Sequence, residues 1–258
     1  MGSPRTSGLA DAGLLARPPS DTVTSMETAA YPTPDVLVAR LARTAGIALP
    51  PERPLSEEFL RDLAGRVGLD GNDLLVIAGL PLPPEALDLE GTAGSWVSML
   101  VQRALPLAPA DRQRLRVRAR AMAERPRPAR TPERPPRPPG PPGFGSLLVH
   151  LLALRNLNES AVAKTMCLMS GVCKAASTIR MVRDGAKALD AELLDGFAAV
   201  LGVPVAVLAS LTGVRPSARG DGPSPEVADI AALIREVRHL TRDQVRELAE
   251  GAEALDRG

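Results

Sequence analysis

Basic and hydroxyl side chains recur at helical spacing near the middle of the second half of the chain. Arg180 and Arg183 are three positions apart, so a helix would place both on one face. A guanidinium group matches the hydrogen-bonding edge of guanine, and lysine, serine and threonine side chains bind phosphate oxygens. These residue types predict a surface that binds nucleic acid. The candidate residues are Lys164, Lys174, Ser177, Thr178, Arg180, Arg183 and Lys187.

The charge around these residues is local. The stretch 160–188 contains five Lys or Arg side chains and one carboxylate, Asp184, which gives it a charge of +4, whereas the whole chain of 258 residues has a net charge of +1. A chain without a broad cationic field can bind DNA only through a local patch of this kind. The alternative is that these charged side chains form an ordinary solvent-exposed helical surface and bind no DNA.

Two short helices must hold these side chains. Asn158 is a good N-cap, and Glu159 in the first turn suits the helix dipole. The apolar spacing breaks over 167–171, and a second helix then runs to Gly185, a residue type that commonly ends helices. The second helix begins at either Ser170 or Ser177. Two short helices joined by a tight turn are typical of a DNA-binding helix-turn-helix.

The stretch from about 146 to 214 resembles the Cro/C1-type, xenobiotic-response-element-like family of regulators. LLVHLLALRNL is similar to the first family helix, LNESAVAKTM to the second, STIRMVRDG to the recognition helix, LDAELLDGFAAVLGV to the fourth and PVAVLASL to the fifth. The resemblance implies a lambda-repressor-like, sequence-specific transcriptional regulator of double-stranded DNA. In that role Arg180 and Arg183 would contact bases or phosphate, and Lys164 and Lys187 would hold backbone phosphate.

One position departs from the family pattern and supports a second hypothesis. Glu159 or Ser160 stands where the family usually has glutamine, and a glutamate there would repel DNA. The alternative function is therefore a helical protein-protein interaction module on a regulator fold that no longer binds DNA.

The rest of the chain predicts an all-α protein of two small helical modules. Aromatic residues are scarce, which favours packed helices built from Leu, Val and Ala. We expect a disordered tail (1–33), a first helical module (34–124), a Pro/Arg-rich linker (125–143), a helix-turn-helix domain (144–214) and C-terminal amphipathic helices (225–258). Translation begins at either Met1 or Met26.

The two modules resemble each other. The stretch 55–80 aligns without a gap to 189–214 at an offset of 134 (189 − 55), and apolar residues and glycines occupy matching positions in the two stretches. The opening helices align at an offset of 111 (152 − 41), so the second module carries 23 extra residues (134 − 111), which fall within 156–188. The first module is therefore expected to lack the helix-turn-helix. We also expect a dimer over two half-sites, with 34–124 or 225–258 contacting a second copy or another protein.

Several function classes lack support in the sequence. No nucleotide-binding loop, HExxH, GxSxG or metal-spaced Cys/His cluster occurs, so an enzyme, a cofactor and a metal site are not predicted. Cys167 and Cys173 are expected to be small apolar side chains near a turn, in keeping with a reducing cytoplasm. No apolar run is long enough to span a membrane, and a cytoplasmic location is expected.

Overall fold

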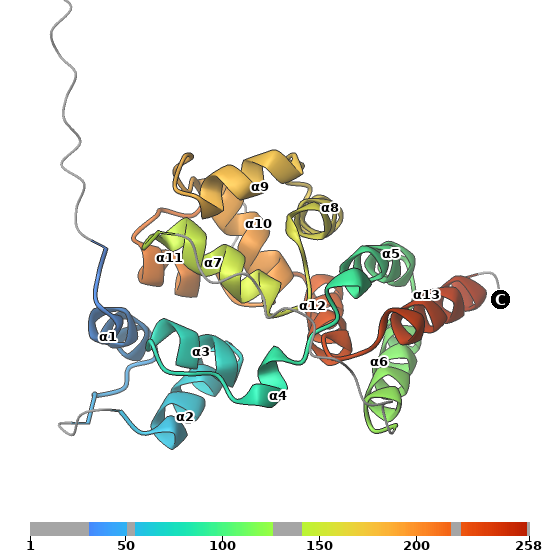
Figure 1. The fold of residues 1–258 in the computed structure, drawn as a ribbon, viewed down its shortest axis with the longest axis horizontal. Helices are drawn as coiled ribbons and strands as arrows, with labels where there is room; N and C mark the ends of the chain where they lie inside the picture. The colour runs from blue at the N-terminus through green and yellow to red at the C-terminus, as the bar shows by residue number, and fades with distance from the viewer. Residues whose placement is uncertain (1–30, 51–54, 126–140, 218–222, 257–258) are drawn as a thin grey trace, which may run out of the picture. The chain divides into compact units, whose positions relative to one another are not determined.

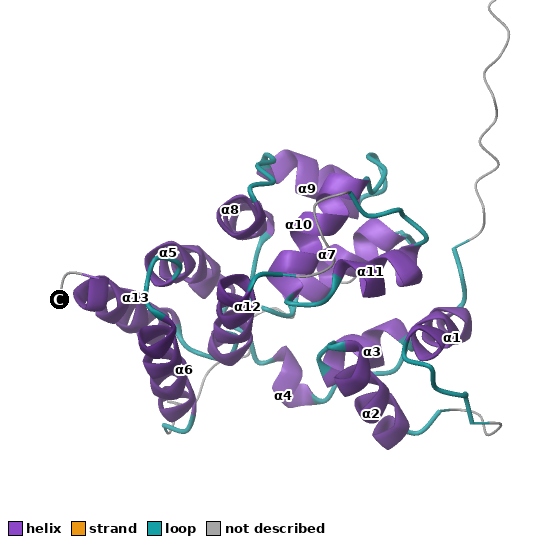
Figure 2. Ribbon diagram, turned by 180° about the vertical axis from the view of Figure 1, so that it is seen from behind, coloured by secondary structure: helices purple, strands orange, loops and turns teal. Residues whose placement is uncertain are grey.

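The computed structural model describes residues 31–50, 55–125, 141–217 and 223–256. All regular elements in these residues are helices (Figures 1 and 2), which confirms the predicted all-α class. Residues 1–30 of the predicted tail and 126–140 of the predicted linker lie outside this part of the chain. The elements are α1 (Pro34–Thr44), α2 (Glu57–Val67), α3 (Gly71–Ile77), α4 (Pro84–Leu87), the 3-10 helix η1 (Gly91–Ala93), α5 (Gly94–Ala104), α6 (Pro109–Ala123), α7 (Phe144–Ala153), α8 (Glu159–Ser170), α9 (Ala176–Arg183), α10 (Ala191–Leu201), α11 (Val205–Thr212), α12 (Pro225–Val237) and α13 (Arg242–Asp256).

Capping side chains and glycines set many of the helix ends, and their residue types are those that favour helix ends in general. Ser56 caps α2 and Asp190 caps α10, each by accepting a hydrogen bond from a backbone N–H in the first turn. Gly68 and Gly202 end these two helices in the left-handed conformation, with φ of 75° and 71°. Equivalent signals in the sequence therefore produce equivalent helices.

The stretches 34–124 and 144–258 were predicted as two modules joined by a linker, but their helices pack against each other. The apolar face of α6 is covered by α12 and α13, and α5 packs against α13 (Figure 1). Elsewhere α1 packs against α11, and α3 packs against α7. A buried ion pair between Arg155 and Asp73 also links the two stretches. Residues from Tyr31 onward consequently form one compact unit.

The element bounds agree with the predicted duplication. α2 and α10 have the same length and begin 134 positions apart (191 − 57), and α3 and α11 also begin 134 apart (205 − 71). Equivalent apolar residues are buried, as in the pairs Leu60 and Leu194 or Leu74 and Leu208, each 0 % exposed. Phe59 aligns with the fully buried Leu193, so the duplication predicts that it is buried, but it is only partly buried. We call residues 34–123 the first copy and residues 144–256 the second copy.

The first helices of the two copies match at an offset of 110, whereas the sequence alignment gave 111. Four buried residues of α1 and four of α7 share the same spacing, and each helix is followed by a residue with positive φ, Gly46 or Asn156 (156 − 46 = 110). The apolar run of α7 is nearly continuous, so it aligns almost equally well in either register. The stretch between the matched helices is therefore 24 residues longer in the second copy (134 − 110), and α8 and α9 lie within that stretch.

Candidate nucleic-acid interface

α8 is anchored by its packing on both copies. The Asn158 side chain accepts a hydrogen bond from the backbone N–H of Ala161 at 3.0 Å and begins the helix as predicted. The buried side chains Val162 and Met166 lie on the face of α8 that packs against α10 and α5. Gly196 of α10 permits this close packing, because a Cβ there would overlap the side chain of Met166. The helix is thus held firmly on one side.

The segment between α8 and α9 is closed by a disulfide between Cys167 and Cys173, which corrects the expectation of two unpaired apolar side chains. Gly171 ends α8 in the left-handed conformation, with φ of 70°, and reverses the chain. The reversal brings the two Cα atoms to 4.3 Å. Val172 is buried between the two cysteines, so both a cross-link and an apolar side chain fix the turn.

α9 begins at Ala176, which supports the predicted start at Ser177 over that at Ser170. Its buried face consists of Ile179 and Val182 and packs on α7. At the closest point Gly145 of α7 lies against Val182, where a Cβ would overlap the Val182 backbone oxygen. The opposite face of α9 is therefore oriented outward by close backbone contact.

The outward surface brings several predicted residues together. Ser177 and Arg180 are exposed on α9, Thr178 is half-buried, and Lys164 is exposed on α8. Neither Arg180 nor Lys164 forms an ion pair with any residue that the structure describes. These two cations are available for a ligand.

The other three candidate cations are already paired with carboxylates. Lys174 contacts Glu192 at 2.6 Å, and Lys187 lies 3.5 Å from Asp190. Arg183 pairs with Glu159 and, at 2.9 Å, with Asp184. The hydrogen bond to Asp184 and the charge of Glu159 raise the pKa of the Arg183 guanidinium, against the opposing effect of partial burial.

These pairs lower the local charge that the sequence suggested. Glu159, Asp190 and Glu192 lie outside the stretch 160–188, yet their side chains neutralise cations within it. Five cations therefore face four carboxylates, and Arg180 and Lys164 are the two cations that form no ion pair with a described residue. The salt bridge from Glu159 also explains how a glutamate is accommodated at the start of α8.

One residue on this surface was missed by the sequence analysis. Met181 of α9 is 46 % exposed, next to Arg180. A signal was present, because the residues at 179 and 182 complete the buried face and leave 181 pointing outward. An exposed apolar side chain beside an arginine suits contact with the methyl group of thymine.

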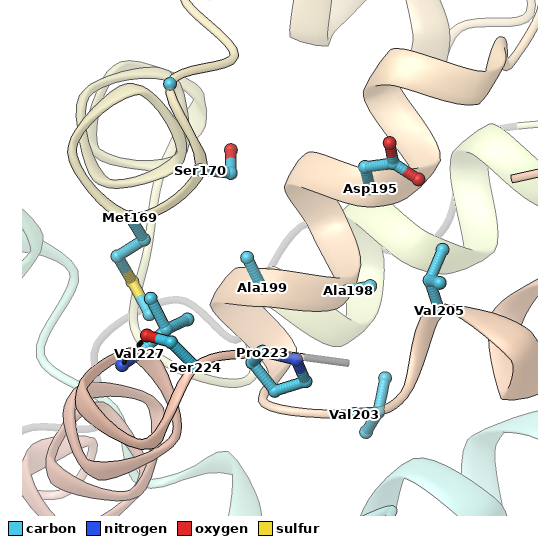
Figure 3. A pocket seen from close by; sticks show the side chains of 11 residues that line it. Met169, Ser170, Asp195, Ala198, Ala199, Val203, Val205, Pro223, Ser224 and Val227 are labelled. Carbon is cyan, nitrogen blue, oxygen red and sulfur yellow. Dashed lines mark hydrogen bonds between the residues drawn. The ribbon is translucent and has the colours of Figure 1, made fainter. Parts of the chain in front are cut away.

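A cavity of about 670 Å³ lies beside the turn between α8 and α9 (Figure 3). Met169, Ala198, Val203 and Val227 form much of its apolar lining, and Asp195 supplies a carboxylate. That carboxylate already accepts hydrogen bonds from the hydroxyl and backbone N–H of Ser217.

Comparisons with known proteins add no relative. No protein-family model, curated protein or solved structure matches this chain. Within the part of the chain described by the structure, none of the helices has the length and apolar character needed to cross a membrane.

Proposed function

We propose that the chain is a sequence-specific transcriptional regulator that binds double-stranded DNA through the outward face of α9. The disulfide between Cys167 and Cys173 removes the cysteine-based reason for expecting a reducing cytoplasm. The observation that carries this proposal is the position of Arg180. Its side chain is exposed and has no ion-pair partner among the described residues, on a helix whose opposite face is fixed against α7. A helix supported in this way has its outer side free to enter the major groove.

The surface suggests a role for each residue. Arg180 would donate hydrogen bonds to a guanine edge, and Met181 would contact a neighbouring thymine methyl. Ser177, Thr178 and Lys164 would hold backbone phosphates. Lys174, Arg183 and Lys187 are engaged by carboxylates, so they would bind phosphate only by exchanging these partners. The resemblance of residues 146–214 to Cro/C1-type regulators supports the same assignment.

Fluorescence anisotropy with duplexes selected from a random-sequence pool tests the proposal. Affinity should fall steeply as salt rises, because bound phosphates release counterions. Arg180→Ala should cost about 1–3 kcal/mol of binding free energy and relax the preference at a base pair. The matched control is Arg66→Ala on α2, whose side chain is 60 % exposed and pairs with Asp62, and it should bind as the wild type does.

A protein-protein interaction module remains the second candidate, because one observation favours it. The carboxylates around Lys174, Arg183 and Lys187 leave a nearly neutral surface that includes an exposed methionine, Met181. If no duplex is enriched and the wild type and Arg180→Ala show the same weak binding to any DNA, the regulator hypothesis is wrong and this alternative replaces it.

A further inference from the structure

The two copies pack against each other through reciprocal contacts. α1 of the first copy contacts α11, and the equivalent α7 of the second copy contacts α3, the equivalent of α11. α5 and α12 end 133 positions apart (237 − 104), and α6 and α13 begin 133 positions apart (242 − 109), so these helices are also equivalent. α5 contacts α13, and the equivalent α12 contacts α6. In a two-fold symmetric dimer, residue i of one subunit contacts residue j of the other and residue j contacts residue i. The copies therefore occupy the positions of two subunits in such a dimer.

The surface between the copies is well packed. Val97 and Leu100 of α5 and Val245 and Leu248 of α13 are at most 1 % exposed. Polar contacts surround this apolar region: Arg116 pairs with Glu236 at 3.0 Å, and Arg112 with Asp229 at 3.2 Å. This surface is fully used inside one chain, so it is closed to a second molecule.

Only one copy carries the candidate DNA-binding helices. In the residues that the structure describes between α1 and α2 (45–50 and 55–56), the first copy has no counterpart of α8 or α9, which lie where the second copy is longer. The first copy instead supports the DNA-binding pair, since α8 packs against α5. At that contact Gly94 is needed, because a Cβ there would overlap the backbone oxygen of Asn156.

We propose that one chain binds a single, non-palindromic DNA site as a monomer, with the first copy in the position that a second DNA-binding subunit would occupy. This inference rests on the proposed function and replaces the homodimer over two half-sites that the sequence suggested. A two-fold dimer with two recognition helices binds half-sites one helical turn apart. Among the described residues α9 has no counterpart in the first copy, and the dimer surface is occupied, so the second half-site would receive no recognition helix.

The test is the stoichiometry and symmetry of the complex formed by the full chain with duplexes enriched from a random-sequence pool. Sedimentation velocity should show a monomer alone and one chain per duplex, and the enriched motif should lack two-fold symmetry. Arg180→Ala should lower affinity about tenfold and relax one base position only. Arg66→Ala should leave the motif and the stoichiometry unchanged.

Other outcomes separate this inference from the function on which it rests. Two chains on an inverted repeat, with Arg180→Ala relaxing two symmetric positions, would overturn the monomer proposal and leave DNA binding intact. Failure to enrich any sequence would overturn both.

Discussion

The two copies differ most clearly at the positions that contact α8 and α9. Gly196 of α10 lies under Met166, whereas the equivalent residue of α2 is Asp62, an exposed side chain that pairs with Arg66. Gly145 of α7 lies under Val182, whereas its equivalent in α1 is the exposed Asp35. The same helical framework thus carries glycine where other helices cover it and aspartate where solvent does.

The copies also differ where they meet. Arg155 and Asp73 form a buried ion pair, 1 % and 0 % exposed, and their equivalents in the other copy are Ala45 and Val207. The reciprocal packing is therefore only pseudo-symmetric, because the first of the two equivalent contacts, α3 with α7 and α1 with α11, has a buried ion pair beside it and the second does not. We infer that this ion pair fixes how the two copies join. If the copies packed in another arrangement, Arg155 and Asp73 would each be buried without an oppositely charged partner.

The largest expected effect comes from removing half of that pair. Asp73→Val puts the residue of the second copy into the first and leaves Arg155 as a buried charge without its partner, which should cost about 3–5 kcal/mol of unfolding free energy. Urea denaturation measures this loss.

The double variant Asp73→Val with Arg155→Met is the control. It removes both charges, so it should recover about 2 kcal/mol relative to Asp73→Val. Equal losses in the single and double variants would show that Asp73 acts only through the first turn of α3, where it accepts a hydrogen bond from the Asp70 N–H.

The next effect tests the glycine-to-aspartate difference directly. Gly196→Asp inserts a Cβ and a charge beneath Met166, and the resulting overlap and desolvation should cost about 4 kcal/mol. The reciprocal change Asp62→Gly affects only an exposed helical position and should cost about 1 kcal/mol or less. Similar losses in the two variants, measured by urea denaturation, would contradict our assignment of Gly196 to close helix packing.

The disulfide should have a smaller effect. It closes a short loop between Cys167 and Cys173, and by the chain-entropy argument its removal should cost about 2 kcal/mol. Thermal unfolding with and without a dithiol reductant measures this difference. The double variant Cys167→Ser with Cys173→Ser should unfold at the same temperature as the reduced wild type, and the reductant should not change that temperature. If the reductant lowers the unfolding temperature of the double variant, the loss in the wild type is not caused by breaking the disulfide.

Much of the local structure could be predicted from the sequence. Caps such as Ser56, Asn158 and Asp190 fix helix starts through contacts three residues away, and glycines such as Gly202 fix helix ends. The register of the first helix was wrong by one residue, because an almost uniformly apolar run carries little register information.

The packing between the copies could not be predicted in the same way. Arg155 and Asp73 are 82 positions apart, and each is a residue type that usually lies at the protein surface. The charge of the candidate site was overestimated for a related reason, since Glu192 pairs with Lys174 from outside the charged stretch. Pairing of the two cysteines depends on the chain reversal at Gly171, which spacing alone does not establish.

Hydrogen exchange of the full chain, with and without a selected duplex, tests most directly whether DNA contacts one copy only. The account predicts slower exchange over α8 and α9, centred on Ser177 to Arg183, and unchanged exchange over α2 of the first copy. Protection of α2 to the same degree, or no protection over α9 at a DNA concentration that saturates binding, would contradict it.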